Sequence, residues 1–160
     1  MRTIDSKRPS VSQIIAAAGL VAGTLDIADA LIFFGLRGVP AVRILQGIAY
    51  GLIGRTSYTQ GMRSALLGLL LHFFIATTVA AIYILASQKL PLSNHPILFG
   101  SLYGVAVYLV MNYVVLPLSH VGLRPLPPVV PLINGVGALV FCVGIPIALI
   151  SSRFLPPAKI

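Results

Sequence analysis

Two aspartates inside the first apolar run are the residues best placed to do chemistry in this chain. The sequence contains three acidic side chains and no glutamate, and Asp26 and Asp29 are two of the three. A charged side chain at the centre of a membrane helix costs roughly 2.5 to 3.5 kcal/mol. Each carboxylate therefore needs a proton, a partner or a wet, protein-lined environment, and intramembrane carboxylates recur in proton and cation pathways.

One histidine lies at a similar depth and could exchange protons with these carboxylates. Counted from the ends of their predicted helices at about 1.5 Å per residue, Asp29 lies about 10 Å deep, Asp26 about 15 Å and His72 about 12 Å. Asn112 and Asn134 fall on the same half of the membrane. We therefore predict a buried polar layer formed by Asp26, Asp29, His72 and Asn112.

Other catalytic and metal-binding patterns are missing from the sequence. It has no phosphate loop, no activated nucleophile and no third strong metal ligand near His72. His95 and His120 lie near prolines in predicted loops, where solvated histidines are expected. Cys142 is the only cysteine, which excludes an intrachain disulfide. We expect no catalytic activity, no cofactor and no metal site.

The composition that surrounds these residues is typical of a polytopic membrane protein. Hydrophobic residues make up 58% of the chain and charged residues 9%, which leaves too little polar surface for a water-soluble globule. A hydrocarbon layer of about 30 Å is crossed by about 20 helical residues. Four apolar runs reach that length, at about 12–36, 64–86, 97–118 and 132–152. The expected fold is all-α, a membrane four-helix bundle that forms a single domain over residues 1–160.

A shorter amphipathic segment, at about 40–54, connects the first two spans. It is too short to cross the membrane, and it carries Arg43 and Gln46 on an otherwise apolar stretch. It is either an interfacial helix in the headgroup plane or a re-entrant half-helix buried by the bundle. The interfacial interpretation is favoured because arginines there can extend toward the headgroups. From this side Arg37, Arg43 and Gln46 are predicted to cap the polar layer over Asp29.

Small residues indicate which helix faces meet. Five glycines mark these faces, namely Gly19, Gly23, Gly68, Gly100 and Gly104. The first two form a G-x-x-x-G pair on the face that carries both aspartates, and the last two repeat that spacing in the third span. Such faces let two helices approach closely, either within the bundle or between subunits. A homo-oligomer and a complex with other membrane subunits are both open at this point.

The cations flank the apolar spans. With a formal net charge of +8 and no compact basic cluster with interleaved aromatics, the chain is expected to contact anionic lipid headgroups and not nucleic acid. Six cations lie on the N-terminal side (Arg2, Lys7, Arg8, Lys89, Arg153, Lys159) and five on the other (Arg37, Arg43, Arg55, Arg63, Arg124). That split is too even for the positive-inside rule to decide. Cytoplasmic termini are expected because three cations precede the first span.

Several segments together resemble a group of small, uncharacterised bacterial integral-membrane proteins. The resemblance covers about residues 19–153 and is carried by GLVAGTLDIADA, RILQGIAYGLIG, LLGLLLHFFIA, GSLYGVAVYLVMNYVVLPLS and VGIPIALISSR. It implies a four-helix protein of the bacterial inner membrane, transfers no activity, and matches polar positions of that group to Asp26, Gln46, His72 and Asn112. The architecture is also similar to small four-helix multidrug exporters that use an embedded carboxylate, although this chain has no tryptophan and its acid is aspartate.

Two kinds of function follow from the polar layer. In the first, the protein is a non-enzymatic structural or accessory membrane component whose buried polar groups set helix register or dock a partner. In the alternative, Asp26, Asp29 and His72 support proton- or cation-linked transport of a small solute. A dry pocket in which Asp26 faces only apolar groups would argue against conduction.

Overall fold

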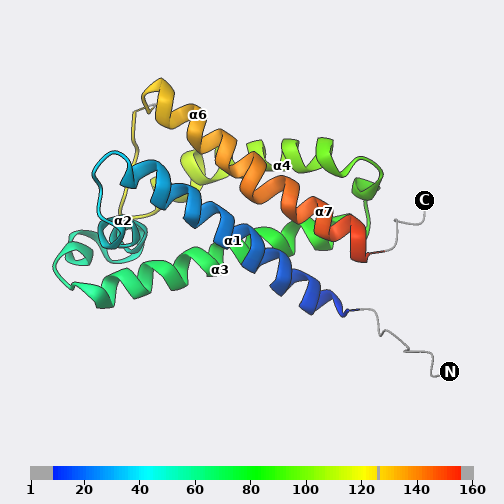
Figure 1. The fold of residues 1–160 in the computed structure, drawn as a ribbon, viewed down its shortest axis with the longest axis horizontal. Helices are drawn as coiled ribbons and strands as arrows, with labels where there is room; N and C mark the ends of the chain where they lie inside the picture. Colours follow the sequence, from blue (N-terminus) through cyan, green and yellow to red (C-terminus); the bar gives the residue numbers. More distant parts are fainter. Residues whose placement is uncertain (1–8, 126, 156–160) are drawn as a thin grey trace.

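The computed structural model describes residues 9–125 and 127–155, and all the regular secondary structure within these ranges is helical (Figure 1). Four helical spans are long and apolar enough to cross a membrane. The first two are α1 (Val11–Gly35) and α3 (Met62–Ser87). The third joins α4 (Pro96–Val110), η3 (Met111–Val115) and α5 (Leu116–Leu118), and the fourth joins α6 (Val129–Ala138), η4 (Leu139–Gly144) and α7 (Ile145–Phe154). The predicted all-α, multi-pass membrane fold is confirmed.

Local signals explain where the spans begin. Ser10 forms a capping box at the start of α1, because its Oγ accepts from the Gln13 backbone N–H while the Gln13 side chain accepts from the Ser10 N–H. The fourth span begins at Val129 instead of the predicted 132, so Pro131 lies within its first turn. Proline is tolerated there because first-turn N–H groups have no partner inside the helix.

Both later spans contain a π-helical turn just before a proline. The turn η3 precedes Pro117, and the turn η4 precedes Pro146. Proline lacks an N–H and its ring crowds the carbonyl four residues earlier, so the regular hydrogen-bond ladder is interrupted at that point. In the fourth span, Cys142 lies within this widened turn.

The helix α2 (Ala41–Ile53) lies across one end of the bundle. Figure 1 shows it nearly end-on while the long helices run across the view, and α1 begins and α7 ends at the opposite end. Its Gln46 and Ala49 are buried, and the Leu45 carbonyl packs against Gly68 of α3, about 9 Å from the start of that helix at 1.5 Å per residue. The helix α2 therefore lies near the start of α3, and both the interfacial and the re-entrant interpretation stay open. The short 3₁₀ helices η1 (Gly54–Tyr58) and η2 (Leu92–Asn94) complete the elements.

Glycines allow the closest helix contacts. A Cβ at Gly19 would lie 2.7 Å from Thr77, and one at Gly23 would lie 2.8 Å from the Phe73 ring, so both glycines face α3. Gly100 and Gly104 of α4 meet the backbone of the fourth span around η4. The structure thus places all five predicted glycines against helices of the same chain, and these faces are covered without a second subunit.

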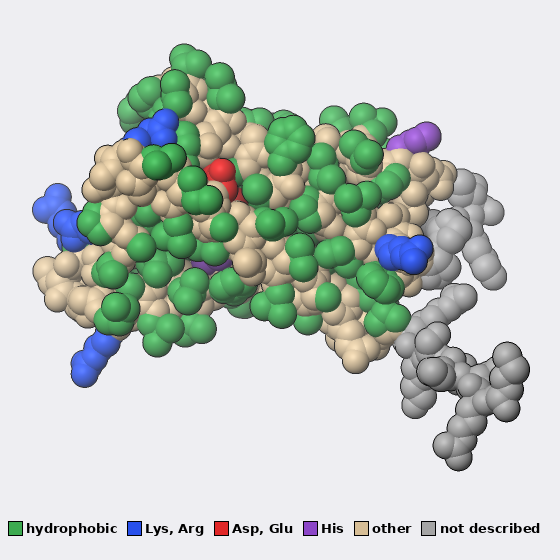
Figure 2. Space-filling model, in the orientation of Figure 1, with side chains coloured by type: hydrophobic (Ala, Val, Ile, Leu, Met, Phe, Trp, Pro, Cys, Tyr) green, Lys and Arg blue, Asp and Glu red, His purple; other side chains and the backbone are tan. Residues whose placement is uncertain are grey.

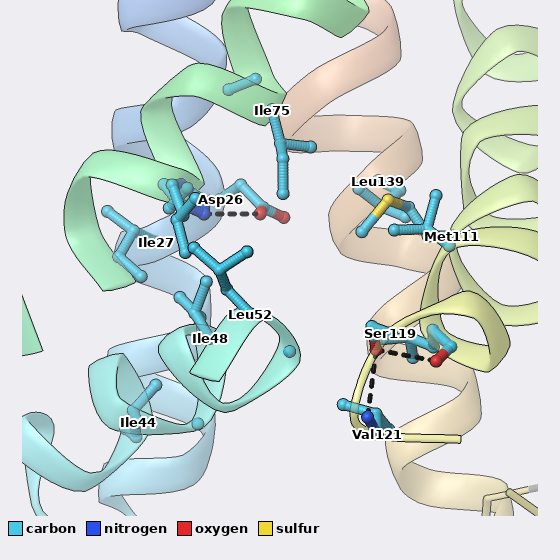
Figure 3. Close-up of a pocket in the computed structure, with 18 of the residues that line it drawn as sticks. Asp26, Ile27, Ile44, Ile48, Leu52, Ile75, Met111, Ser119, Val121 and Leu139 are labelled. Atoms are coloured by element: carbon cyan, nitrogen blue, oxygen red, sulfur yellow. Dashed lines mark hydrogen bonds and ion pairs between the residues drawn. The ribbon is translucent and has the colours of Figure 1, made fainter. Parts of the chain in front are cut away.

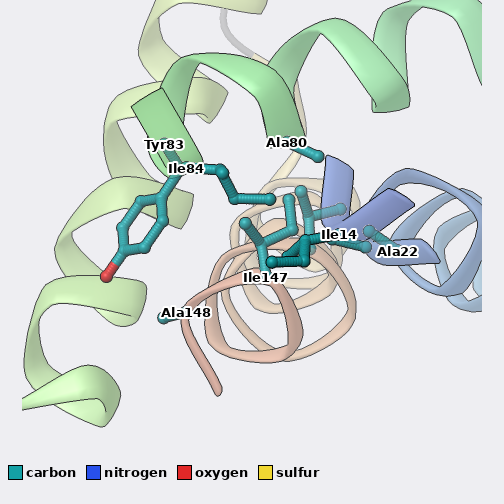
Figure 4. Close-up of a cluster of buried hydrophobic side chains, with 9 residues drawn as sticks. Ile14, Ala22, Ala80, Tyr83, Ile84, Ile147 and Ala148 are labelled. Atoms are coloured by element: carbon teal, nitrogen blue, oxygen red, sulfur yellow. The ribbon is translucent and has the colours of Figure 1, made fainter. Parts of the chain in front are cut away.

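Tight packing is concentrated in one half of the bundle. Buried side chains from α1, α3 and the fourth span form a core toward the end where α1 begins, including Ile14, Ala22, Ala80, Ile84 and Ile147 (Figure 4). Alanine and glycine at these contacts bring the helix axes together, which suits helices that associate by close packing in lipid. The opposite half, where α2 lies, is hollow.

The surface is that of a protein in a bilayer. Large apolar side chains point outward from the middle of the spans, such as Phe74 at 69% exposed and Phe141 at 70%. Figure 2 shows hydrophobic side chains between two ends that carry the Lys and Arg groups. A soluble monomer does not expose apolar surface on this scale. The orientation prediction depends partly on Arg2, Lys7, Arg8 and Lys159, which lie outside the described residues.

Candidate functional site

The central feature of the hollow half is a pair formed by His72 of α3 and Asp26 of α1. The Nε2 atom of His72 lies 2.8 Å from the Gly23 carbonyl oxygen. Because a carbonyl only accepts, Nε2 carries the hydrogen and donates it. This bond directs Nδ1 toward Asp26, whose Oδ2 lies 4.0 Å away. Any proton that the pair gains or loses is therefore carried on Nδ1 or on the carboxyl group.

Both members of the pair line a cavity of about 660 Å³ between the four spans and α2 (Figure 3). The side chain of Asp26 is 28% exposed and that of His72 is 12% exposed, so the carboxylate is the more accessible group. The remaining wall is mostly aliphatic and includes Ile48, Ile75 and Leu139. The pocket is therefore not one in which Asp26 faces apolar groups alone, which was the arrangement that would argue against conduction.

Apart from Asp26 and His72, the polar lining residues of the cavity lie near the arginine-rich end of the molecule. Tyr58, Ser119 and Arg124 belong to its lining, and the Ser119 hydroxyl is occupied by the Leu116 carbonyl and the Val121 N–H. Among the described lining residues, Asp26 is the acid and Arg124 is the strong base. Sequence reasoning missed Arg124 as a lining residue, because it lies in a proline-rich loop with no helical periodicity to indicate its direction.

Asp29 belongs to a different environment from Asp26. Its Oδ2 accepts a hydrogen bond of 2.9 Å from the Asn134 side chain of α6, and it is not among the cavity-lining residues. Three residues along a helix turn through about 300°, which leaves the two side chains about 60° apart. That angle directs one aspartate to the cavity and the other to α6. The structure divides the predicted layer into two pairs.

Asn112 does not join either pair. Its side-chain amide donates to the Tyr108 carbonyl at 2.9 Å, one turn earlier in the same span. An asparagine within a helix can bond its own backbone in this way, so no partner on another helix is needed. The sequence predicted Asn112 in the same layer as Asp26 but could not show that its amide is bonded within its own helix.

The predicted arginine caps are wrong. Arg37 donates to the Phe33 carbonyl at 2.7 Å and its guanidinium lies 3.5 Å from the centre of the Phe33 ring. Arg43 lies 4.1 Å from the centre of the Tyr58 ring. Aromatic faces attract guanidinium groups, and both arginines find a ring close by. Within the ranges that the structure describes, neither forms an ion pair with Asp29.

Gln46 is also used elsewhere. Its Nε2 donates to the Gly61 carbonyl at 3.0 Å and lies 3.5 Å from the Ser64 hydroxyl. The side chain therefore holds α2 to the start of α3, and it is 5% exposed. Buried amides need such partners because an unsatisfied polar group is costly in a bilayer. Gln46 positions the helix that forms one cavity wall, without contact to the aspartates.

Within residues 9–125 and 127–155, no three His, Cys, Asp or Glu side chains gather in a way that could hold an ion.

Comparisons with protein families, with curated protein sequences and with solved structures find no match for this chain. The features that bear on function are therefore the cavity and the two ionisable side chains, Asp26 and His72, that line it.

Proposed function

We propose that the protein is a non-enzymatic membrane carrier that binds a small organic cation at Asp26 in exchange for a proton. The observation that supports this most directly is the Asp26 carboxylate, which reaches into a cavity of about 660 Å³ and faces His72. Sites for small molecules commonly fall between about 300 and 1,000 Å³ and combine apolar walls with a few polar groups.

The charge of the ligand follows from the partners of Asp26. No lysine or arginine among the described residues pairs with this carboxylate, and its nearest ionisable neighbour is His72. An intramembrane charge is favoured when an opposite charge accompanies it. A cation with apolar substituents would neutralise the carboxylate and fit the aliphatic wall.

The proton follows from the geometry of the pair. When no cation is bound, a proton can balance the charge of Asp26. On Nδ1 of His72 the proton supplies a positive charge, and on the carboxyl group it removes the negative charge. A cation beside the carboxylate competes with that proton, so binding should release it. The other ionisable groups around the pair are Asp29 on α1, Cys142 on η4 (which packs against α1), and Tyr58 and Arg124 in the cavity lining.

A structural or accessory role is the second candidate, and one contact favours it. The Asp29 carboxylate ties α1 to α6 through Asn134 and takes no part in the cavity. If Asp26 served the same purpose, its loss would change stability and leave ligand binding untouched. The two aspartates therefore separate the two functions residue by residue.

The proposal includes a bilayer with anionic headgroups as the surrounding partner. Arg43, Arg55 and Arg63 are exposed at the end of the bundle where α2 lies, which supports headgroup contact on that side. Neighbouring cations of this kind attract anionic lipid surfaces. The resemblance to small bacterial membrane proteins leads us to propose the bacterial inner membrane as the location, with both termini in the cytoplasm.

The test measures cation binding and proton release together. Purified protein in lipid nanodiscs is titrated with tetraphenylphosphonium, an apolar cation that carries no exchangeable proton, in weakly buffered solution. We expect saturable binding with release of up to about one proton per cation, and an affinity at least about tenfold lower for Asp26→Asn, equivalent to about 1.4 kcal/mol.

Asp29→Asn is the matched control, because it changes the same charge one turn away and should bind as the wild type does. Equal affinity for Asp26→Asn and wild type would exclude a cation site at Asp26. If folded wild-type protein binds no cation and Asp26→Asn changes only its thermal stability, the accessory role is favoured instead.

A further inference from the structure

We infer that the ligand is an amphiphilic ammonium compound whose alkyl chain lies in a crevice between α3 and α4 and which enters from the bilayer. The inference rests on the proposed function, since it places the cationic end at Asp26. It starts from a second cavity of about 320 Å³ whose lining residues all come from α3, α4 and η3.

The crevice exists because α3 and α4 approach each other at few points. One contact is a hydrogen bond of 2.8 Å from the Tyr103 hydroxyl to the Val79 carbonyl. The Tyr103 ring also meets the Tyr83 ring, with 5.0 Å between their centroids. These contacts hold the helices together toward the packed half of the bundle, so they leave the crevice open beside the hollow half.

The crevice and the central cavity share part of their walls. Five residues line both, namely Ile75, Val79, Val107, Met111 and Val115. The two spaces are therefore neighbours, separated by no more than these side chains. Because Met111 and Val115 lie in η3, the π-helical turn before Pro117 forms part of the shared wall.

The outer rim of the crevice faces the hydrocarbon layer. Phe74, Ile82 and Val110 line it and are exposed, and Phe74 and Val110 lie near the middle of their spans. At this position the surrounding solvent is lipid, not water. A molecule that passes the rim therefore arrives from the bilayer.

The chemistry of the crevice selects an alkyl chain. Its side-chain lining is hydrocarbon except for the Met111 thioether and two hydroxyl groups. The Thr78 hydroxyl donates to the Phe74 carbonyl at 2.8 Å, and the Tyr103 hydroxyl donates to Val79, so both are occupied. The crevice thus accommodates apolar groups, while Asp26 and His72 in the adjoining cavity supply the polar end. An ammonium group with a linear chain matches both.

The experiment fills the crevice without touching the cavity. Ala106 is exposed and lines the crevice but not the cavity, whereas Val105 is exposed and lines neither. Ala106→Trp and its control Val105→Trp are titrated in nanodiscs with dodecyltrimethylammonium and with tetraethylammonium. We expect Ala106→Trp to weaken dodecyltrimethylammonium binding at least about tenfold, with tetraethylammonium affinity unchanged, and Val105→Trp to change neither. Dodecyltrimethylammonium also partitions into the nanodisc lipid. This contribution is the same for all variants because they are compared in identical nanodiscs.

The outcomes separate this inference from the proposed function. If tetraethylammonium binding depends on Asp26 but Ala106→Trp binds dodecyltrimethylammonium as the wild type does, the crevice site is wrong and the cation site stands. The crevice site is also wrong if Ala106→Trp, and Thr78→Trp on the opposite wall, each weaken the binding of both cations equally. Binding of either cation that is indifferent to Asp26→Asn overturns the proposed function, and this inference with it.

Discussion

At the scale of single residues, the two aspartates of α1 are held by different kinds of partner. Asp26 faces an imidazole across 4.0 Å and has space beside it, whereas Asp29 accepts a hydrogen bond of 2.9 Å from Asn134. A group with a neighbouring cavity can exchange a proton or a cation with a ligand. A group already bonded to another helix contributes to the stability of the bundle, and its loss should be visible there.

Replacement of Asp29 by leucine tests that division. Asp29→Leu removes the acceptor for Asn134 and should lower the free energy of unfolding by about 1 kcal/mol, the usual size of a hydrogen bond between membrane helices. Cation binding should stay within about twofold of the wild type. Unfolding is followed by circular dichroism during titration with sodium dodecyl sulfate in mixed micelles. Loss of cation binding in folded Asp29→Leu, with no change in Asp26→Asn, would reverse the two roles.

The residue scale also shows what sequence reasoning can reach. Helical rise alone placed Asp26 and His72 at similar depths, and the structure brings them to 4.0 Å. The sequence could not predict the arginine contacts, because the position of a guanidinium group depends on the side-chain rotamer and on nearby rings such as Phe33 and Tyr58. Nor could it find that the Asn112 amide is bonded within its own helix.

At the scale of elements, α2 is a structural part of the cavity. It supplies Ile44, Ile48 and Leu52 to the wall, and it is held to α3 by close backbone packing at Gly68 and by Gln46. The sequence predicted a short amphipathic segment at about 40–54, because the apolar stretch is too short to cross the membrane and carries Arg43 and Gln46. Its angle across the bundle depends on contacts with α3 that no local pattern contains.

A substitution at Gly68 tests this contact. A Cβ at Gly68 would overlap the Leu45 carbonyl, which is backbone and cannot rotate away. Gly68→Ala should therefore lower the free energy of unfolding by about 1 to 3 kcal/mol, the usual cost of overpacking, and weaken cation binding as the wall shifts. Gly137→Ala is the matched control, because nothing lies within 4 Å of its Cβ position and alanine favours the helix. Thermal unfolding in mild detergent measures the stability of the two variants. Equal unfolding midpoints for Gly68→Ala and Gly137→Ala would contradict the packing argument.

At the scale of the whole molecule, the bundle is packed at one end and hollow at the other. The core around Ile84 and Ile147 holds the ends of α1 and α7 together, while Asp26 and His72 line the hollow end. The four spans were predictable because an apolar run of membrane length leaves few alternatives. The hollow was not, because a cavity is the space that four helices and α2 fail to fill, and it depends on all of their positions together.

Because the apolar spans suit a bilayer, the cost of introducing a charge should depend on its depth along a span. Phe141 and Phe154 are both exposed on the fourth span, but Phe141 lies near its centre and Phe154 is its last residue, beside Arg153. Phe141→Arg should cost roughly 2.5 to 3.5 kcal/mol because it places a cation in the hydrocarbon layer, whereas Phe154→Arg places one among headgroups at little cost. The measurement is the fraction of expressed protein that resists carbonate extraction and elutes as a folded species in mild detergent. We expect that fraction to fall several-fold for Phe141→Arg alone. Equal fractions for the two variants would mean that the face around Phe141 does not meet lipid.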